Sequence, residues 1–75
     1  DILLIPREAE KGYKAIMVEF KYLKKDEENK LQEMQKQAKE QIEEYASFED
    51  IKDINDLHKY TVVAINDKLY VQKII

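Results

Sequence analysis

An acid and a lysine stand two residues apart in an apolar stretch of the chain. Glu19 and Lys21 interrupt residues 14–23, a run rich in strand-forming side chains. Residues i and i+2 of a strand point to the same face, so a strand here places both charged groups side by side. Such groups are expensive to bury unless they are paired or bound to a cation. A carboxylate beside an ammonium group suits metal-assisted chemistry on a phosphate, in which the lysine steadies a nucleophile or a developing charge.

A second carboxylate joins this pair if the chain begins with a hairpin. Residues 2–5 are a short apolar run stopped by Pro6, and residues 7–12 are polar and end in the only glycine. We therefore predict a strand, a turn and a second strand over 14–23. Because both faces of the second strand are apolar in its first half, we expect a central strand that is covered on two sides.

The predicted register of this hairpin opposes Leu3 to Met17 and Asp1 to Glu19. Directly opposed side chains have Cβ atoms about 4.5–5.5 Å apart, so two carboxylates would face each other beside Lys21. Like charges so placed call for a raised pKa on one of them or a divalent cation between them. Hard oxygen ligands with open positions suit Mg²⁺ or Mn²⁺. A slip of one residue would separate the two acids.

Residues 24–47 change to a helical period. Side chains of one arc recur at i, i+3 or i+4, and i+7: Leu31, Met34, Gln35, Ala38, Ile42 and Tyr45. The acids at the start of the segment lie favourably near a positive helix end. The pattern predicts one amphipathic helix that packs on the sheet, with Tyr45 in the core.

Gln41 falls just outside the apolar arc of this helix. A neutral amide at that position could lean over the sheet toward the group formed by Asp1, Glu19 and Lys21 without burying a charge. We therefore include Gln41 among the candidate site residues.

The remainder of the chain predicts more sheet. Residues 48–57 are a mixed acidic segment, expected as a short helix or a loop. Residues 59–65 and 68–74 are β-rich runs separated by Asn66 and Asp67, a pair that tolerates the positive φ of a two-residue turn. The predicted order is β-β-α-β-β in an α/β fold, with a mixed sheet and one long helix.

Composition limits the class of protein. The chain has 75 residues, of which 39% are charged, with a net charge of −3 and no cysteine. A pI near 5.1 argues against holding nucleic acid by bulk positive charge alone. The longest uncharged apolar run, residues 60–65, is far shorter than the ~20 residues that span a bilayer. The lack of cysteine fits a reducing compartment, so we expect a cytoplasmic protein.

Three features together resemble the PD-(D/E)XK nuclease superfamily: Asp1 at the start of a strand, Glu-Phe-Lys at 19–21, and Gln-Ile-Glu-Glu-Tyr at 41–45. The chain resembles more closely the nuclease-like domain that follows an AAA-type ATPase-like domain in many bacterial proteins, over residues 1–74. The resemblance implies that Asp1, Glu19 and the backbone carbonyl of Phe20 bind Mg²⁺ or Mn²⁺. It also implies that Lys21 is the catalytic lysine, that Gln41 assists, and that the substrate is nucleic acid, with DNA expected.

The same resemblance implies that residues 1–75 are one domain fragment. The leading helix and first strand of the family fold are absent, so we expect a truncated restriction-endonuclease-like core from a longer protein. Missing strands would leave a sheet edge open, and we therefore expect a homodimer through open sheet edges. An ATPase-like domain in the full-length chain is the other expected partner. We expect no membrane partner.

Two plainer interpretations stay open. The acid-x-lysine pattern occurs three times: Glu19/Lys21, Glu28/Lys30 and Asp50/Lys52. Only the first lies inside an apolar strand, and it could be an ordinary cross-strand salt bridge at an exposed strand end. The domain would then be a catalytically silent interaction or regulatory module. The only histidine, His58, is expected to be solvated or to cap a strand.

Overall fold

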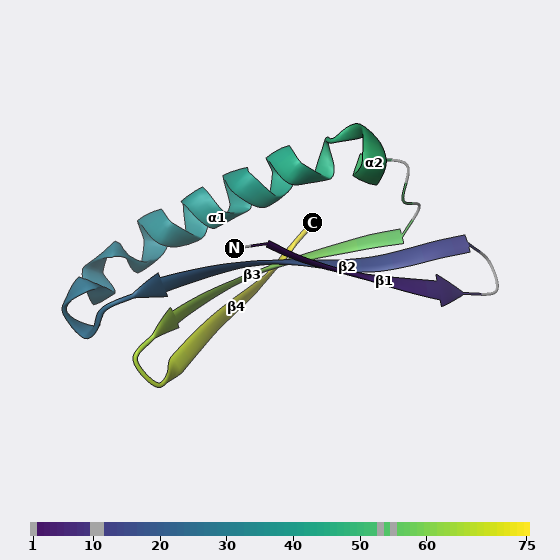
Figure 1. The fold of residues 1–75 in the computed structure, drawn as a ribbon. Helices are drawn as coiled ribbons and strands as arrows, with labels where there is room; N and C mark the ends of the chain where they lie inside the picture. The colour runs from purple at the N-terminus through teal and green to yellow at the C-terminus, as the bar shows by residue number, and fades with distance from the viewer. Residues whose placement is uncertain (1, 10–11, 53, 55) are drawn as a thin grey trace.

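The computed structural model describes residues 2–9, 12–52, 54 and 56–75, with side chains described outside 6–14 and 50. One sheet holds four strands in the order β1-β2-β3-β4 (Figure 1). These are β1 (Ile2–Ala9), β2 (Gly12–Leu23), β3 (Asp56–Ile65) and β4 (Lys68–Ile74). β2 pairs in parallel with β3, and both outer pairs are antiparallel, so the sheet is mixed. The predicted β-β-α-β-β order is confirmed.

The parallel pairing of β2 and β3 requires a long crossover, because a tight turn can join only antiparallel neighbours. The crossover contains η1 (Lys25–Lys30), α1 (Leu31–Ala46) and α2 (Glu49–Lys52). α1 runs along one face of the sheet (Figure 1). The short helix α2 is one of the two forms expected for residues 48–57. In the part of the chain that the structure describes, no helix has the length and apolar character needed to cross a membrane.

The prediction of a single helix over 24–47 is wrong at its start. η1 is a 3-10 helix with no buried residue, and Glu27 inside it has non-helical angles of φ −105° and ψ 15°. The six residues of η1 are all polar, so no apolar side chain anchors this turn to the sheet. Regular α-helix begins at Leu31, the first residue of the apolar arc.

The core lies between α1 and the sheet, as the helical period predicts. Ala38 and Ile42 of α1 are fully buried. One apolar cluster joins Met17, Ile42 and Ile74, and a second joins Leu23, Val63 and Ile65. The cluster residues come from α1, β2, β3 and β4, so packing of α1 on the sheet holds these three strands together.

The expectation that both faces of β2 are covered is wrong for the described residues. β2 is an interior strand, but the helices lie on one face of the sheet only (Figure 1). The other face leaves apolar side chains in solvent, among them Leu3, Ile5, Tyr22, Leu69 and Val71.

The first hairpin differs from its prediction by one residue. β1 continues through Pro6 to Ala9, and its register opposes Ile2 to Glu19 and Leu4 to Met17. Proline is tolerated because β1 is an edge strand, where an N–H can lack a ladder partner. The predicted opposition of Asp1 to Glu19 is therefore wrong, and Asp1 itself lies outside the described residues.

The second hairpin has the predicted turn. Ile65 pairs with Lys68, and Asn66 between them has a φ of 56°, in the left-handed region that asparagine tolerates. β3 begins at Asp56 rather than at residue 59.

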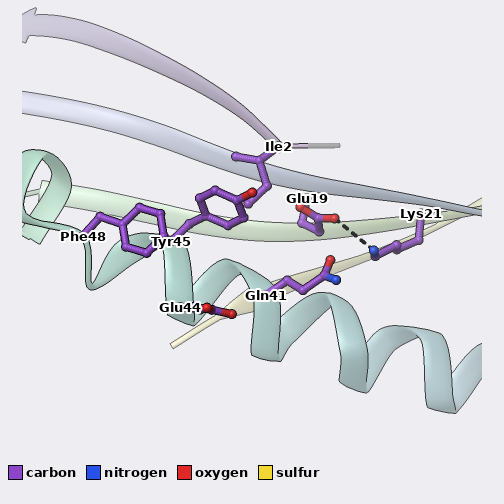
Figure 2. Close-up of a pocket in the computed structure, with 7 residues that line it drawn as sticks. All are labelled: Ile2, Glu19, Lys21, Gln41, Glu44, Tyr45 and Phe48. Carbon is purple, nitrogen blue, oxygen red and sulfur yellow. Dashed lines mark ion pairs between the residues drawn. The ribbon is translucent and has the colours of Figure 1, made fainter.

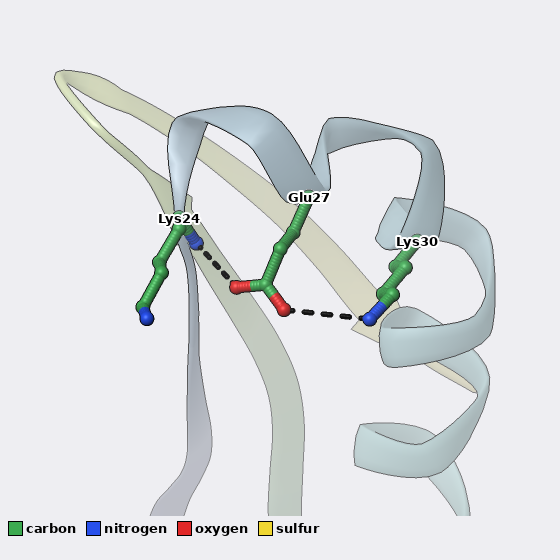
Figure 3. Close-up of polar contacts among 3 residues, drawn as sticks. All are labelled: Lys24, Glu27 and Lys30. Atoms are coloured by element: carbon green, nitrogen blue, oxygen red, sulfur yellow. Dashed lines mark hydrogen bonds and ion pairs between the residues drawn. The ribbon is translucent and has the colours of Figure 1, made fainter.

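The start of η1 is held by hydrogen bonds to the Glu27 carboxylate. The Lys24 N–H donates to Glu27 Oε1 at 3.0 Å, and Lys30 Nζ donates to Oε2 at 3.5 Å (Figure 3). The backbone hydrogen bond from Lys24 lowers the pKa of Glu27 below its ordinary value of 4.5. A group whose pKa is lowered on folding stabilises the fold above its ordinary pKa, and this stabilisation is lost as the pH falls through the lowered value.

We therefore predict that Glu27→Ala lowers the urea midpoint slightly at neutral pH and flattens its decline below pH 4.5. Urea titrations from neutral to acidic pH measure this. Glu28→Ala, an exposed acid in the same turn, is the control. Equal pH profiles for the two variants would contradict the assignment.

Candidate functional site

A pocket of about 340 Å³ opens between α1 and the sheet (Figure 2). It is lined by Ile2, Glu19, Lys21, Gln41, Glu44, Tyr45 and Phe48. Three of the predicted site residues, Glu19, Lys21 and Gln41, therefore share one cavity. They come from β2 and from the helix that crosses over it.

The floor of the pocket is a buried ion pair. Lys21 Nζ lies 3.4 Å from Glu19 Oε1, and the two side chains are 21% and 2% exposed. Both point to the face under α1 because they are two residues apart in β2. The pair lies within one strand and is buried at its carboxylate, unlike the exposed cross-strand salt bridge that the sequence also allowed.

Gln41 lies at the border of the buried arc of α1, one residue before Ile42. Its side chain is exposed to the pocket, and Figure 2 shows its amide extending from the helix toward Glu19 and Lys21. This agrees with the predicted placement. An amide offers both a donor and an acceptor, so it can hold a phosphate oxygen or a water without adding charge.

Thr61 is a buried polar residue beside the site that the sequence analysis did not select. It pairs with Glu19 across the β2–β3 ladder and is fully buried. Its hydroxyl has no hydrogen-bond partner among the described residues. Leaving a buried hydroxyl unsatisfied costs about 1–3 kcal/mol. The available signal was the hydroxyl itself, within the apolar run of residues 60–65, and the pairing with Glu19 came only from the structure.

The donor chemistry at this site is that of a hard cation, although the ligand set is partial. Among the described residues no group of three or more His, Cys, Asp or Glu side chains could hold a metal ion. Glu19 and the orphan hydroxyl of Thr61 offer oxygen atoms only, and the backbone of Phe20 lies beside Glu19 in β2. Mg²⁺ is commonly held by one or two carboxylates while it keeps several waters, and Glu19 supplies one carboxylate of that kind. Asp1, the second predicted ligand, is outside the described residues.

Two aromatic rings form the outer wall of the pocket. The ring centroids of Tyr45 and Phe48 are 5.2 Å apart at an angle of 56°. The residues are 42% and 48% exposed, so the prediction that Tyr45 lies in the core is wrong. The position follows the helical period, but the last turn of α1 borders the pocket rather than packed side chains.

His58 is remote from this chemistry. Its Nε2 lies 2.8 Å from Asp56 Oδ1, and both side chains are about 40% exposed. His58 pairs with Ile16 in the sheet register, which places it on the face opposite Glu19. The expectation that His58 is solvated agrees with this exposure.

No protein-family model matches the chain, and comparisons with curated proteins and with solved structures give no significant match.

Removal of one partner of the ion pair should lower the stability of the fold. Lys21→Met should lower the free energy of unfolding by about 1–3 kcal/mol, because the buried Glu19 carboxylate loses the ammonium group that lies 3.4 Å away. The double variant Lys21→Met/Glu19→Leu should regain most of the lost free energy of unfolding, or become more stable than the unmodified protein, because the buried charge is removed as well. Urea denaturation of the three proteins measures both changes.

Lys52→Met is the matched control, since Lys52 pairs with Glu49 at 3.9 Å in solvent. It should change stability by less than about 0.5 kcal/mol. A double variant less stable than Lys21→Met would contradict the assignment of Glu19 as a destabilising buried charge.

Proposed function

We propose that the chain is a PD-(D/E)XK-like nuclease domain with a truncated restriction-endonuclease-like core. It uses Mg²⁺ or Mn²⁺ to hydrolyse phosphodiester bonds of nucleic acid, and DNA is the proposed substrate. One observation carries the proposal: the buried Glu19 carboxylate is 3.4 Å from Lys21 Nζ in a pocket that Gln41 also lines. A buried charge is often replaceable by apolar residues without loss of stability, so its presence in a pocket supports a role beyond packing.

Each side chain has a role that follows from its position. Glu19 would hold the cation from the pocket floor, with the carbonyl of Phe20 and the carboxylate of Asp1 as the further proposed ligands. A divalent cation, when bound, supplies polarisation of a phosphoryl oxygen and lowers the pKa of bound water. The Lys21 ammonium group steadies the nucleophile or the charge that develops on phosphate. Gln41 orients a water or a phosphate oxygen from above.

The charge of the pocket supports a metal requirement. Its lining contains two carboxylates, Glu19 and Glu44, and one ammonium group, Lys21, for a net charge of −1. Phosphate is repelled by such a pocket until a divalent cation reverses the sign. The chain as a whole has a net charge of −3 and cannot compensate with a general basic surface.

The proposal predicts that Glu19→Gln weakens Mg²⁺ or Mn²⁺ binding by about tenfold or more, because the amide keeps the shape and removes the charged ligand. Isothermal titration calorimetry with MgCl₂ or MnCl₂ measures the affinity. Glu43→Gln, an exposed acid of α1 outside the pocket, is the control. Unchanged affinity in Glu19→Gln would refute the metal assignment.

Lys21→Met and Gln41→Ala separate chemistry from metal binding. Gln41→Ala should leave cation affinity nearly unchanged, and Lys21→Met should not weaken it, because the variant removes a positive charge beside Glu19. Lys21→Met should still lower cleavage of a labelled DNA by about 10²–10³-fold through loss of charge stabilisation. Circular dichroism under the assay conditions confirms that each variant is folded. Full cleavage by Lys21→Met would contradict its catalytic role.

A second candidate function is a catalytically silent interaction or regulatory domain. The specific observation in its favour is the uncovered apolar face of the sheet, where Tyr22 is 71%, Leu69 68% and Val71 59% exposed. Exposed apolar patches of this kind mark contact surfaces. Absence of any Mg²⁺ or Mn²⁺ binding by the unmodified protein would select this candidate over the nuclease.

We further propose that two copies pair through an open sheet edge. β1 and β4 are the outer strands, and β4 bears exposed Leu69 and Val71 without a described neighbour beyond it. Edge strands offer unpaired backbone groups to a second chain. The ATPase-like domain as partner in the full-length chain and a cytoplasmic location belong to the same proposal and rest on the resemblance.

The pairing proposal predicts a dimer in light scattering at high protein concentration. Val71→Lys should shift it toward monomer without unfolding, because a lysine on an edge strand blocks edge-to-edge addition. Glu43→Lys, on the exposed side of α1, is the control. A strictly monomeric protein at all concentrations would contradict the proposal.

A further inference from the structure

The aromatic wall of the pocket has no part in the chemistry assigned to Glu19, Lys21 and Gln41. Tyr45 and Phe48 are a contacting pair of rings, each more than two-fifths exposed, at the end of α1. Figure 2 shows them side by side, with Tyr45 nearer the ion pair and Phe48 farther out. Exposed rings beside a polar cavity can stack against a ligand that has a flat apolar face.

We infer that Tyr45 and Phe48 form a stacking platform for an unpaired nucleobase of the strand whose phosphate lies at Glu19 and Lys21. This inference rests on the proposed function and names its substrate class. Stacking of a base on an aromatic side chain contributes to single-strand binding whatever the base, because every base has a π-face. A base inside a duplex is already stacked on both sides, so the platform selects a single strand or a frayed end.

The spacing along α1 fits one nucleotide. Gln41 and Tyr45 are four residues apart, so they lie on one side of the helix about 6 Å apart along its axis. Gln41 borders the ion pair and Tyr45 borders Phe48, which places the polar and the aromatic parts of the pocket one helical turn apart. A phosphate and the base of its own nucleotide are separated on the same scale.

The charges of the pocket make the two parts of the ligand behave differently. The base gains from the rings whether or not a cation is present. The phosphate is opposed by Glu19 and Glu44 until a divalent cation is bound. Affinity for a single strand should therefore have a cation-dependent part from the phosphate and a ring-dependent part from the base.

Fluorescence anisotropy with a short labelled single-stranded DNA, and with the matching blunt duplex, tests the platform. Ca²⁺ replaces Mg²⁺ so that the probe is not cut. Phe48→Ala should weaken single-strand binding by about 5–100-fold, the range for loss of one stacked base. Its effect on the duplex should be several times smaller. Phe48→Tyr should keep most of the affinity, since the ring is retained.

Tyr22→Ala is the matched control because Tyr22 is an exposed aromatic residue on the uncovered face of the sheet. It should leave both affinities unchanged. A single strand with one abasic position in place of the stacked base should lose affinity for the unmodified protein and lose little further with Phe48→Ala. Thermal denaturation of Phe48→Ala checks that the exposed substitution leaves the fold intact.

The outcomes separate the platform from the proposed function. The platform is refuted if Phe48→Ala leaves single-strand affinity unchanged, or if it weakens binding of the single strand and of the duplex equally. This holds even if Glu19→Gln no longer binds the cation. No binding of the single strand by the unmodified protein overturns it as well. Glu19→Gln could keep full cation affinity while Phe48→Ala weakens single-strand binding. That result would support the platform and refute the metal-dependent nuclease.

Discussion

The parallel pairing of β2 with β3 is the constraint on which the rest of the structure depends. Parallel neighbours cannot be joined by a tight turn, so the chain must leave β2, travel back along the sheet and enter β3 in the same direction. The return path is α1, and it buries Ala38 and Ile42 against one face. That face is the one to which Glu19 and Lys21 point. The connection that completes the sheet therefore also roofs the charged pair, and the pocket is the space left where α1 passes over β1 and β2.

Glu19 and Thr61 make this roofed face less stable than it could be. A buried carboxylate and a buried hydroxyl lie next to each other in the ladder, where the described residues form two small apolar clusters. Apolar side chains at both positions would extend those clusters without a desolvation cost. A small domain has little stability to spare. The proposed function therefore rests on these polar groups and not on the fold class.

The two candidate functions lie on opposite faces of the sheet. One face has α1, the ion pair and the aromatic wall, and it is the surface that we propose binds a nucleotide. The other face is apolar and uncovered among the described residues, with Tyr22, Leu69 and Val71 in solvent. Contact with another protein there would leave the pocket open, because the two surfaces are on opposite sides of β2. A nuclease and an interaction module are therefore compatible within one small sheet.

The sequence by itself determined the local structure. Its helical period placed α1 and the burial of Ile42, Asn66 marked the turn between β3 and β4, and the two-residue spacing put Glu19 and Lys21 on one face. These features depend on neighbours in the chain, and side-chain periodicity records them. Only the tertiary structure decided the hairpin register, the exposure of Tyr45 and the place of Thr61. The register of β1 against β2 depends on β1 lying at the sheet edge, because an edge strand can continue through Pro6. The resulting register places Ile2, and not an acid, opposite Glu19. Tyr45 has the period of a core residue but overlies a cavity, and Thr61 meets Glu19 across more than forty intervening residues, a contact that no local pattern encodes.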